Sequence, residues 1–372
     1  MPILPTQAVL DVVNAPVTRT RHRCEIFEAD GTTRFASGAF DARMTSGSVT
    51  IDFSRAERRA FEFQLANDDL ALVNSPDGIW YDKIFRPYYS ILIPDTGLWY
   101  DFPLGEFVVD SISEPHFPNV MDLSGRDCTK KCLLSKFTTT TTFAGGSSPE
   151  YLIRTVALNA GIEKFILPVT GLTVTGDTSF EKGVDRWTAM DQIATAYNFH
   201  LFFDAQGYLV MDENQDPLTS PLVHAFTTGP GGNLVSYTKS TNDSRIYNHV
   251  SVTGDSSDAD VIPVHAEALN TEPSSPTRIS EIGDRLYEYD SSFITTTEQA
   301  QAVTDSFLQV HALEEYNLDF GAIAAPWLEV GGIVTFADPV LATTVRMLLS
   351  SLTIPLGPGA MSGVGKRVLK VG

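Results

Sequence analysis

The chain has few groups of side chains whose type and spacing could bind a metal. Cys128 and Cys132 are separated by three residues, and no histidine or further cysteine nearby completes a set of four zinc ligands. Residues 212–216 copy the first three ligands of a calcium loop, but Pro217 replaces the required glycine and Val223 replaces the bidentate glutamate. The spacing therefore predicts a pair of partly buried thiols and a surface turn, and no metal site.

The sequence also has none of the short motifs that mark common catalytic centres. It contains no HExxH, GxSxG, Walker A or CxxC pattern. The glycines of residues 357–363 lack the spacing of a dinucleotide loop and predict a flexible turn. The histidines are scattered, and His200, among aromatic residues, is interpreted as a strand residue with a hydrogen-bond partner. We predict no catalytic, cofactor-binding or metal-binding residue. A pair of carboxylates at the separation used by glycosidases could arise in the fold, but the sequence does not reveal it.

Charge is concentrated in one part of the chain. The 372 residues include 26 basic and 46 acidic side chains, a net charge of −20. Residues 200–345 hold 21 acidic and 4 basic side chains, a net charge of −17. This excludes tight binding of nucleic acid, which needs a cationic surface that releases counterions. Two interpretations stay open: a solvated surface that maintains solubility, or a wall that does not retain a passing polyanion.

Length and cysteine content limit the class of protein. The length predicts two or three domains. Three cysteines do not form a disulfide framework, so we expect synthesis in a reducing compartment. No apolar run approaches the length of about 20 residues that a membrane span requires. The first apolar stretch precedes the basic cluster, the reverse of a secretory signal, so we expect no Sec export.

The first third of the chain has the alternation of antiparallel strands. In residues 59–65, phenylalanines lie two apart with Glu62 and Gln64 between them, so one face is apolar and the other polar. Further strands are expected at residues 88–94, 99–102, 105–111 and 120–125. The pattern favours a closed or sandwiched antiparallel sheet over βαβ units.

The middle of the chain predicts a small α/β unit over residues 129–224. Ser148 can cap a helix that Gly161 ends, and Asp185 can begin a second helix. Residues 205–207 then form the turn of a hairpin.

The last third returns to strands. They are expected at residues 247–253 and 316–320. A helix near residues 297–313 begins at a capping box that we assign to Thr295 and Glu298.

Four segments in a fixed order carry a resemblance to one family. They are LGEFVVDSIS (104–113), WTAMDQIATAYNFHLFFDAQGYLVMD (187–212), YNHVSVTGD (247–255) and the run from YEYDSSFITTT to PWLEVGGIVTF (287–336). Together they resemble the tail-tip or baseplate hub proteins of tailed bacteriophages and related contractile injection systems. The resemblance spans residues 20–356. One departure is Gly332, where the family often has aspartate after the glycine of LEVG.

The resemblance implies a β-rich α+β fold with two tail-tube-like antiparallel β-barrel domains and a small α/β insertion. The barrels would be residues 17–128 and 225–372, with the α/β domain at 129–224. It further implies a structural virion protein, not an enzyme, assembled in the bacterial host cytoplasm into a homotrimeric ring at the tail tip. This ring would join the tail tube or distal tail protein to a central spike, fibre or tape-measure protein. Viral DNA would pass through it without specific binding, and no cofactor is implied.

Three functional hypotheses follow. In the hub, part of the acidic stretch would face the lumen, with Asp255, Asp258 and Asp260 as candidates, because cations on that wall would retain DNA within the Debye length of about 8 Å. The alternative is a tail-associated cell-wall or polysaccharide hydrolase using paired carboxylates. A carbohydrate-binding module would need an exposed aromatic platform. The candidates are Trp80, Trp99, Trp187 and Trp327, of which Trp187, at helical spacing, is expected in the core.

Overall fold

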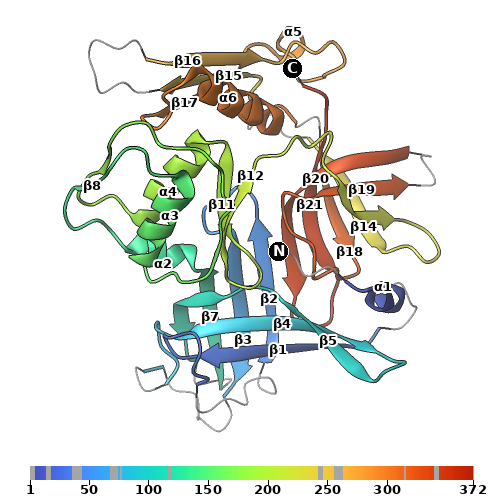
Figure 1. The fold of residues 1–372 in the computed structure, drawn as a ribbon. Coiled ribbons are helices and arrows are strands. Elements are labelled where there is room, and N and C mark those ends of the chain that lie inside the picture. Colours follow the sequence, from blue (N-terminus) through green and yellow to red (C-terminus); the bar gives the residue numbers. More distant parts are fainter. Residues whose placement is uncertain are drawn as a thin grey trace.

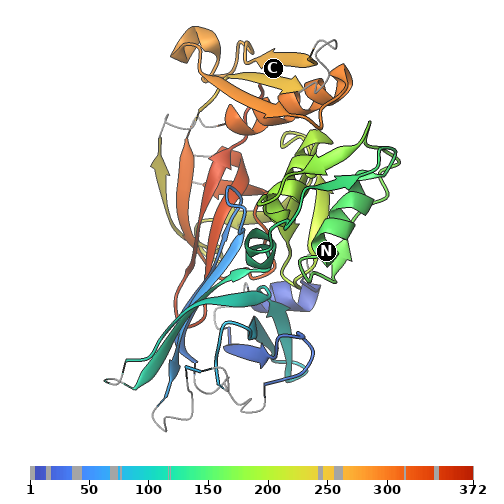
Figure 2. The ribbon, with the colours of Figure 1, turned by 90° about the vertical axis from the view of Figure 1, so that its left-hand side faces the viewer.

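The protein is described by a computed structural model that covers residues 5–13, 18–35, 44–67, 74–75, 78–115, 117, 119–241, 246–254, 263–313, 316–338 and 343–371. Figure 1 shows a large sheet at the bottom and right, a helical unit at the left and a small sheet with a helix at the top. Figure 2 gives the same arrangement from the side.

The elements follow one another in three groups. The first group comprises α1 (Gln7–Val13), β1 (Thr20–Phe27), β2 (Met44–Asp52), β3 (Arg59–Ala66), β4 (Ile84–Ile93), β5 (Leu98–Pro103), β6 (Phe107–Ser113) and β7 (Val120–Asp127). The second comprises α2 (Thr129–Leu134), β8 (Thr141–Phe143), α3 (Pro149–Leu158), β9 (Phe165–Ile166), β10 (Thr178–Phe180), α4 (Arg186–Ala196), β11 (Phe199–Phe203) and β12 (Leu209–Glu213).

The third group begins with β13 (Leu222–Thr227), β14 (Leu234–Ser240), β15 (His249–Gly254), β16 (His265–Leu269), α5 (Ile279–Ile282), β17 (Leu286–Ser291) and α6 (Thr297–His311). It ends with β18 (Asn317–Ala322), β19 (Ile333–Asp338), β20 (Thr343–Pro355) and β21 (Met361–Arg367). The expected strand-rich beginning and end are therefore present, as are the two helices and the hairpin between them.

Strands from both ends of the chain build one sheet of 13 strands. Its order is β1-β4-β6-β7-β3-β2-β20-β21-β18-β14, with β5 added to β4 and β13–β19 added to β20. The long strand β20 is shared, because its first half pairs with β19 and residues 351–355 pair with β2. We expected two antiparallel β-barrel domains, whereas the structure pairs their strands in one sheet. Within the described residues, the β2–β20 ladder joins the two strand sets into one sheet whose order ends at β1 and β14.

Aromatic side chains fill the inner face of this sheet. In the first set, Phe61 stacks on Phe63, with ring centroids 4.3 Å apart. In the second set, Phe226 lies 4.8 Å from Phe320. The alternation of residues 59–65 therefore has the predicted outcome, since the phenylalanines are buried while Glu62 is exposed.

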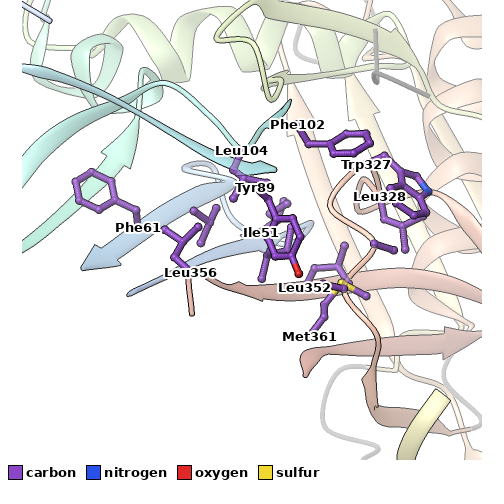
Figure 3. Packing of buried hydrophobic residues seen from close by; sticks show 14 of the residues in the cluster. Ile51, Phe61, Tyr89, Phe102, Leu104, Trp327, Leu328, Leu352, Leu356 and Met361 are labelled. Carbon is purple, nitrogen blue, oxygen red and sulfur yellow. The ribbon is translucent and has the colours of Figure 1, made fainter. Parts of the chain in front are cut away.

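The two sets share one hydrophobic core. Figure 3 shows Ile51 of β2 and Leu352 of β20 lying between aromatic residues of both sets. On the same cluster, the rings of Phe102 and Trp327 are 5.5 Å apart. Burial of apolar surface, at about 25 cal/mol per Å², therefore holds the two strand sets together in addition to the β2–β20 ladder.

A second hydrophobic cluster unites the α/β unit with the three-stranded sheet β16–β15–β17. Side chains of α3, α4, β11 and β12 meet those of β15 and α6 in it. The caps form as predicted: the Ser148 hydroxyl accepts from the Tyr151 N–H, and the Asp185 carboxylate accepts from the Thr188 N–H. The protein is thus built on two main apolar cores that meet at a seam.

The capping box of α6 is one residue later than predicted. Thr296 is the N-cap, and its hydroxyl accepts from the Gln299 N–H while the Gln299 amide oxygen accepts from the Thr296 N–H. Three consecutive threonines allow either register, and Gln299 reaches the free backbone N–H groups where Glu298 does not.

No helix among the described residues combines the length and the apolar run needed to cross a membrane.

Candidate functional site: a buried charged junction

A buried arginine lies where the large sheet meets the α/β unit. Arg59 begins β3 and shares the inward face with Phe61 and Phe63, because alternate residues of a strand point the same way. Its side chain is 1% exposed. A charged residue in register with the apolar face was the available sequence signal for this junction, which we did not predict.

Arg59 uses its guanidinium to connect three parts of the chain. Its Nε donates to the Phe203 carbonyl oxygen at 3.2 Å, and its Nη1 donates to the Leu104 carbonyl oxygen at 3.0 Å. Its Nη2 donates to the Glu329 carboxylate. These partners belong to the end of β11, the β5–β6 connection and the turn before β19. The junction is therefore a positioning device that fixes the α/β unit on the sheet.

The neighbouring Arg58 is also buried but has aromatic partners. Its guanidinium carbon lies 4.0 Å from the ring centre of Phe202 and 5.1 Å from that of Phe53. Burial lowers the pKa of Arg58 to about 10, opposed by the attraction of Glu329. Arg58 thus keeps its charge at neutral pH, and the cation–π contacts replace part of its lost hydration.

Asp127, at the end of β7, receives backbone donors at the same junction. One carboxylate oxygen accepts from the Arg59 N–H at 2.9 Å, and the other accepts from the Thr129 N–H at 3.0 Å. Burial raises the pKa of Asp127 to about 6, and the two N–H groups partly offset that rise. Asp127 has no solvent exposure, so it holds the start of α2 against β3 and has no access to a substrate.

An ion pair also joins the large sheet to the α/β unit. Glu106 accepts from the Lys164 Nζ at 2.6 Å and from the Arg86 Nε at 2.8 Å. Gly207, in the hairpin turn of the α/β unit, lies directly against Glu106: a β-carbon on Gly207 would come within 2.7 Å of the Glu106 β-carbon. The predicted turn is therefore also the contact surface of the α/β unit.

A polar groove of about 380 Å³ lies on the outer face of β2, β3, β7 and β6. The strand registers place two rows of side chains across it. The rows are Ser48, Glu62, Ser124 and Ser111, and Ser46, Gln64, Asp122 and Ser113. The Gln64 amide donates to Asp122 at 2.8 Å, which occupies one carboxylate oxygen.

Hydrolysis by paired carboxylates has a specific requirement. A general acid needs a raised pKa beside the scissile bond. Asp127, whose pKa is raised to about 6, lies at the other end of β7 and is fully buried. The groove offers hydroxyl groups and carboxylates to a partner or to solvent, and no described feature of it favours the hydrolase.

The cysteines and histidine that the sequence singled out have structural roles. Burial raises the pKa of Cys128 to about 12 and raises that of Cys132 as well, so both thiols are inert. Among the described residues, no group of three or more histidine, cysteine, aspartate or glutamate side chains could hold a metal ion. The His200 Nδ1 lies 3.0 Å from the Asn214 side-chain oxygen, which confirms the predicted partner.

The tryptophans do not form one platform. Trp187 is in the second core, as predicted, and Trp327 is in the first core. Trp80 is half-buried, whereas Trp99 is exposed on β5. The lumen candidates Asp255, Asp258 and Asp260 lie outside the described residues, in the segment between β15 and β16.

Comparison with known proteins relates this architecture to solved structures. No protein-family model and no curated protein sequence matches the chain. A tail protein from Neisseria meningitidis MC58 superposes with a TM-score of 0.63 over 93% of this chain and 96% of its own, at 14% identity. The chain has the fold of phage tail proteins.

Two further solved structures support this conclusion about the phage tail fold. The 43 kDa tail protein of prophage MuSo2 from Shewanella oneidensis has a TM-score of 0.61, with 93% of this chain and 98% of that chain covered, at 13% identity. Prophage tail protein gp18 from Listeria monocytogenes EGD-e has a TM-score of 0.55, with 92% and 94% covered, also at 13% identity. Each of the three likenesses covers more than nine tenths of this chain.

Proposed function

We propose that the chain is a structural subunit of a phage tail tip or baseplate, acting as the hub. Three copies would form a ring around the DNA channel, in the virion, after assembly in the host cytoplasm. The ring would join the tail tube or distal tail protein on one side to a spike, fibre or tape-measure protein on the other. The observation that supports this proposal most is the tail-protein fold over nearly the whole chain, in three solved structures from three bacteria.

The internal architecture agrees with a structural role. The two strand sets share a core, and the α/β unit is held to them by the Arg59–Phe203 hydrogen bond and the Lys164–Glu106 ion pair. As part of the proposal, the sets at residues 17–128 and 225–372 correspond to tube-like units, with 129–224 inserted between them. Asp255, Asp258 and Asp260 would face the channel, where negative charge prevents retention of DNA.

Deletion of the chain from the phage that encodes it tests this function. We expect tails that lack the tip when viewed by electron microscopy, and tip assembly restored by the chain supplied in trans. Purified protein should form a three-fold ring by light scattering and microscopy. A stable monomer that degrades peptidoglycan, or intact tail tips after the deletion, would overturn the proposal in favour of the hydrolase or of another role.

A further inference from the structure

The large sheet has one face on the shared core and an opposite face that is open. Figure 2 shows the α/β unit to the right of the sheet, with the left side of the strands uncovered. In β2, Val49 and Ile51 are buried, whereas Ser48 and Thr50, which alternate with them, are partly exposed. The same alternation holds in β20, where the outward Thr353 is partly exposed. The open face therefore continues from the first strand set into the second across the β2–β20 ladder.

Serine is the commonest residue on this open face, whose side chains lie in three rows across the strands. Two rows cross the first strand set, and they are Ser111, Ser124, Glu62 and Ser48, and Ser113, Asp122, Gln64 and Ser46. The third row crosses into the second strand set, and it is Thr50, Thr353, Ser362, Gly321 and Ser236. We call the residues of the three rows the serine face. The polar groove of about 380 Å³ is part of it.

The side chains of the serine face are short, and several bind one another. The hydroxyl oxygens of Ser111 and Ser124 are 2.7 Å apart, and those of Thr50 and Thr353 are 3.3 Å apart. Strands are stabilised by β-branched and aromatic side chains, so strand stability does not account for a run of serines. The three rows also contain no aromatic or arginine side chain of the kind that forms the energetic centre of a protein interface. The face is therefore smooth and polar, which suits a partner that moves past it.

The charge of the serine face is negative. Glu62 and Asp122 are the ionised side chains of its rows, and among the described residues no lysine or arginine pairs with either of them. Arg126 lies in line with the third row, on β7. Its guanidinium is bound by Glu57 and Asp110, so its positive charge is balanced within the chain. The face thus offers hydroxyl groups and carboxylates to whatever lies against it.

We propose that the serine face lines the DNA channel of the ring, so this inference rests on the proposed hub. DNA is retained by lysine and arginine side chains, which neutralise its phosphates and release counterions. A lining of hydroxyl groups offers only uncharged donors to the phosphate oxygens, and its carboxylates offer none. Because the face crosses from one strand set to the other within each copy, neighbouring copies extend it around the channel. DNA then passes along a wall that forms no strong contact with it.

Cysteine labelling locates the serine face in the assembled tail. The native Cys24, Cys128 and Cys132 are buried, so only an introduced thiol reacts. In the purified subunit, Ser124→Cys and the exposed control Thr175→Cys should each react with a small maleimide and with a maleimide on a bulky polymer. In tails that have released their DNA, Ser124→Cys should still react with the small reagent but no longer with the polymer. Reaction with both reagents would place the face on the outside of the tail, and reaction with neither would place it in a subunit contact, and either result overturns the proposal.

Added lysines test the effect on DNA and separate this inference from the hub itself. The double variant Ser46→Lys and Ser362→Lys puts cations on the face, and Thr139→Lys with Thr175→Lys is the matched control at exposed positions of the α/β unit. In particles whose tips look normal by electron microscopy, the first variant should slow DNA release at least about tenfold, and high salt should relieve the delay. A dye that fluoresces on released DNA measures the rate. Unchanged release, or equal slowing by the control, overturns the lining and leaves the proposed hub intact, whereas intact tips after deletion of the chain overturn both.

Discussion

The Nε of Arg59 donates to the backbone carbonyl of Phe203 across the seam between the large sheet and the α/β unit, at 3.2 Å. The two residues are 144 positions apart in the chain. Their bond joins an element of the first apolar core to one of the second. A phage tail fold built this way depends on a few buried polar contacts for the relative position of its parts.

Arg59→Leu should strongly destabilise the protein. It removes one charge of a buried pair, which leaves the Glu329 carboxylate and two carbonyls without their donor, and such losses cost about 3–5 kcal/mol. Urea unfolding followed by circular dichroism measures the change. Arg55→Leu, at an exposed arginine, is the control and should change stability by less than about 0.5 kcal/mol. Equal effects of the two substitutions would show that the Arg59 contacts do not stabilise the protein.

The role of Arg59 could be only partly predicted from the sequence. Caps at Ser148 and Asp185 form as expected, because the donor and acceptor lie within four residues. The β2–β20 ladder joins residues that are hundreds of positions apart, and the Arg59–Phe203 bond spans 144 positions. Local alternation of apolar and polar residues does not identify such distant partners. Arg59 is in register with the buried Phe61 and Phe63, but the alternation alone does not show which distant groups its side chain binds.

Gly207→Ala should destabilise the contact between the hairpin turn and Glu106. Gly207 has φ of +77°, and a β-carbon there would lie 2.7 Å from the Glu106 β-carbon. Strain and overpacking together should cost about 2–4 kcal/mol.

Gly171→Ala is the matched control for that change. Its φ is +70°, but nothing lies within 4 Å of the added carbon, so only backbone strain of about 1 kcal/mol is expected. Thermal unfolding compares the two variants. If Gly207→Ala destabilises the protein no more than Gly171→Ala does, the close packing of Gly207 against Glu106 contributes nothing to stability.

Acid should destabilise the protein through two half-buried histidines. Burial lowers the pKa of His200 and of His224 to about 4, from 6.5 in the unfolded chain. Between these values the unfolded state binds more protons, so stability falls as the pH decreases from about 6.5 to 4, by about 3 kcal/mol for each residue. Urea midpoints at pH 7, 5.5 and 4.5 measure this. His200→Gln should flatten the dependence, and an unchanged slope would contradict the assignment.

Asp127 should act in the opposite direction over nearly the same range. Its folded pKa of about 6 lies above the unfolded value of 3.8, so the folded state binds more protons between them. Stability from this group therefore rises as the pH decreases from about 6 to 4. Since His200 and His224 have the largest of the histidine shifts, the wild-type protein should still lose stability. In the double variant His200→Gln and His224→Gln, Asp127 and Asp191, whose pKa values burial raises, should reverse the slope against the opposite effect of His22. Continued loss of stability would show that the contribution of these carboxylates is negligible.

Thr296→Ala should destabilise α6 more than Thr295→Ala does. The Thr296 hydroxyl accepts from the Gln299 N–H and is the N-cap, so its loss should cost about 1 kcal/mol. The Thr295 hydroxyl donates to the Gln299 side chain, but the Thr295 backbone N–H also binds that oxygen and keeps it in place. The two substitutions remove the same atoms at adjacent positions, which makes each the control for the other. Chemical unfolding with hydrogen exchange of α6 amides measures both. A larger effect at Thr295 would restore the register with Glu298 that the sequence pattern first indicated.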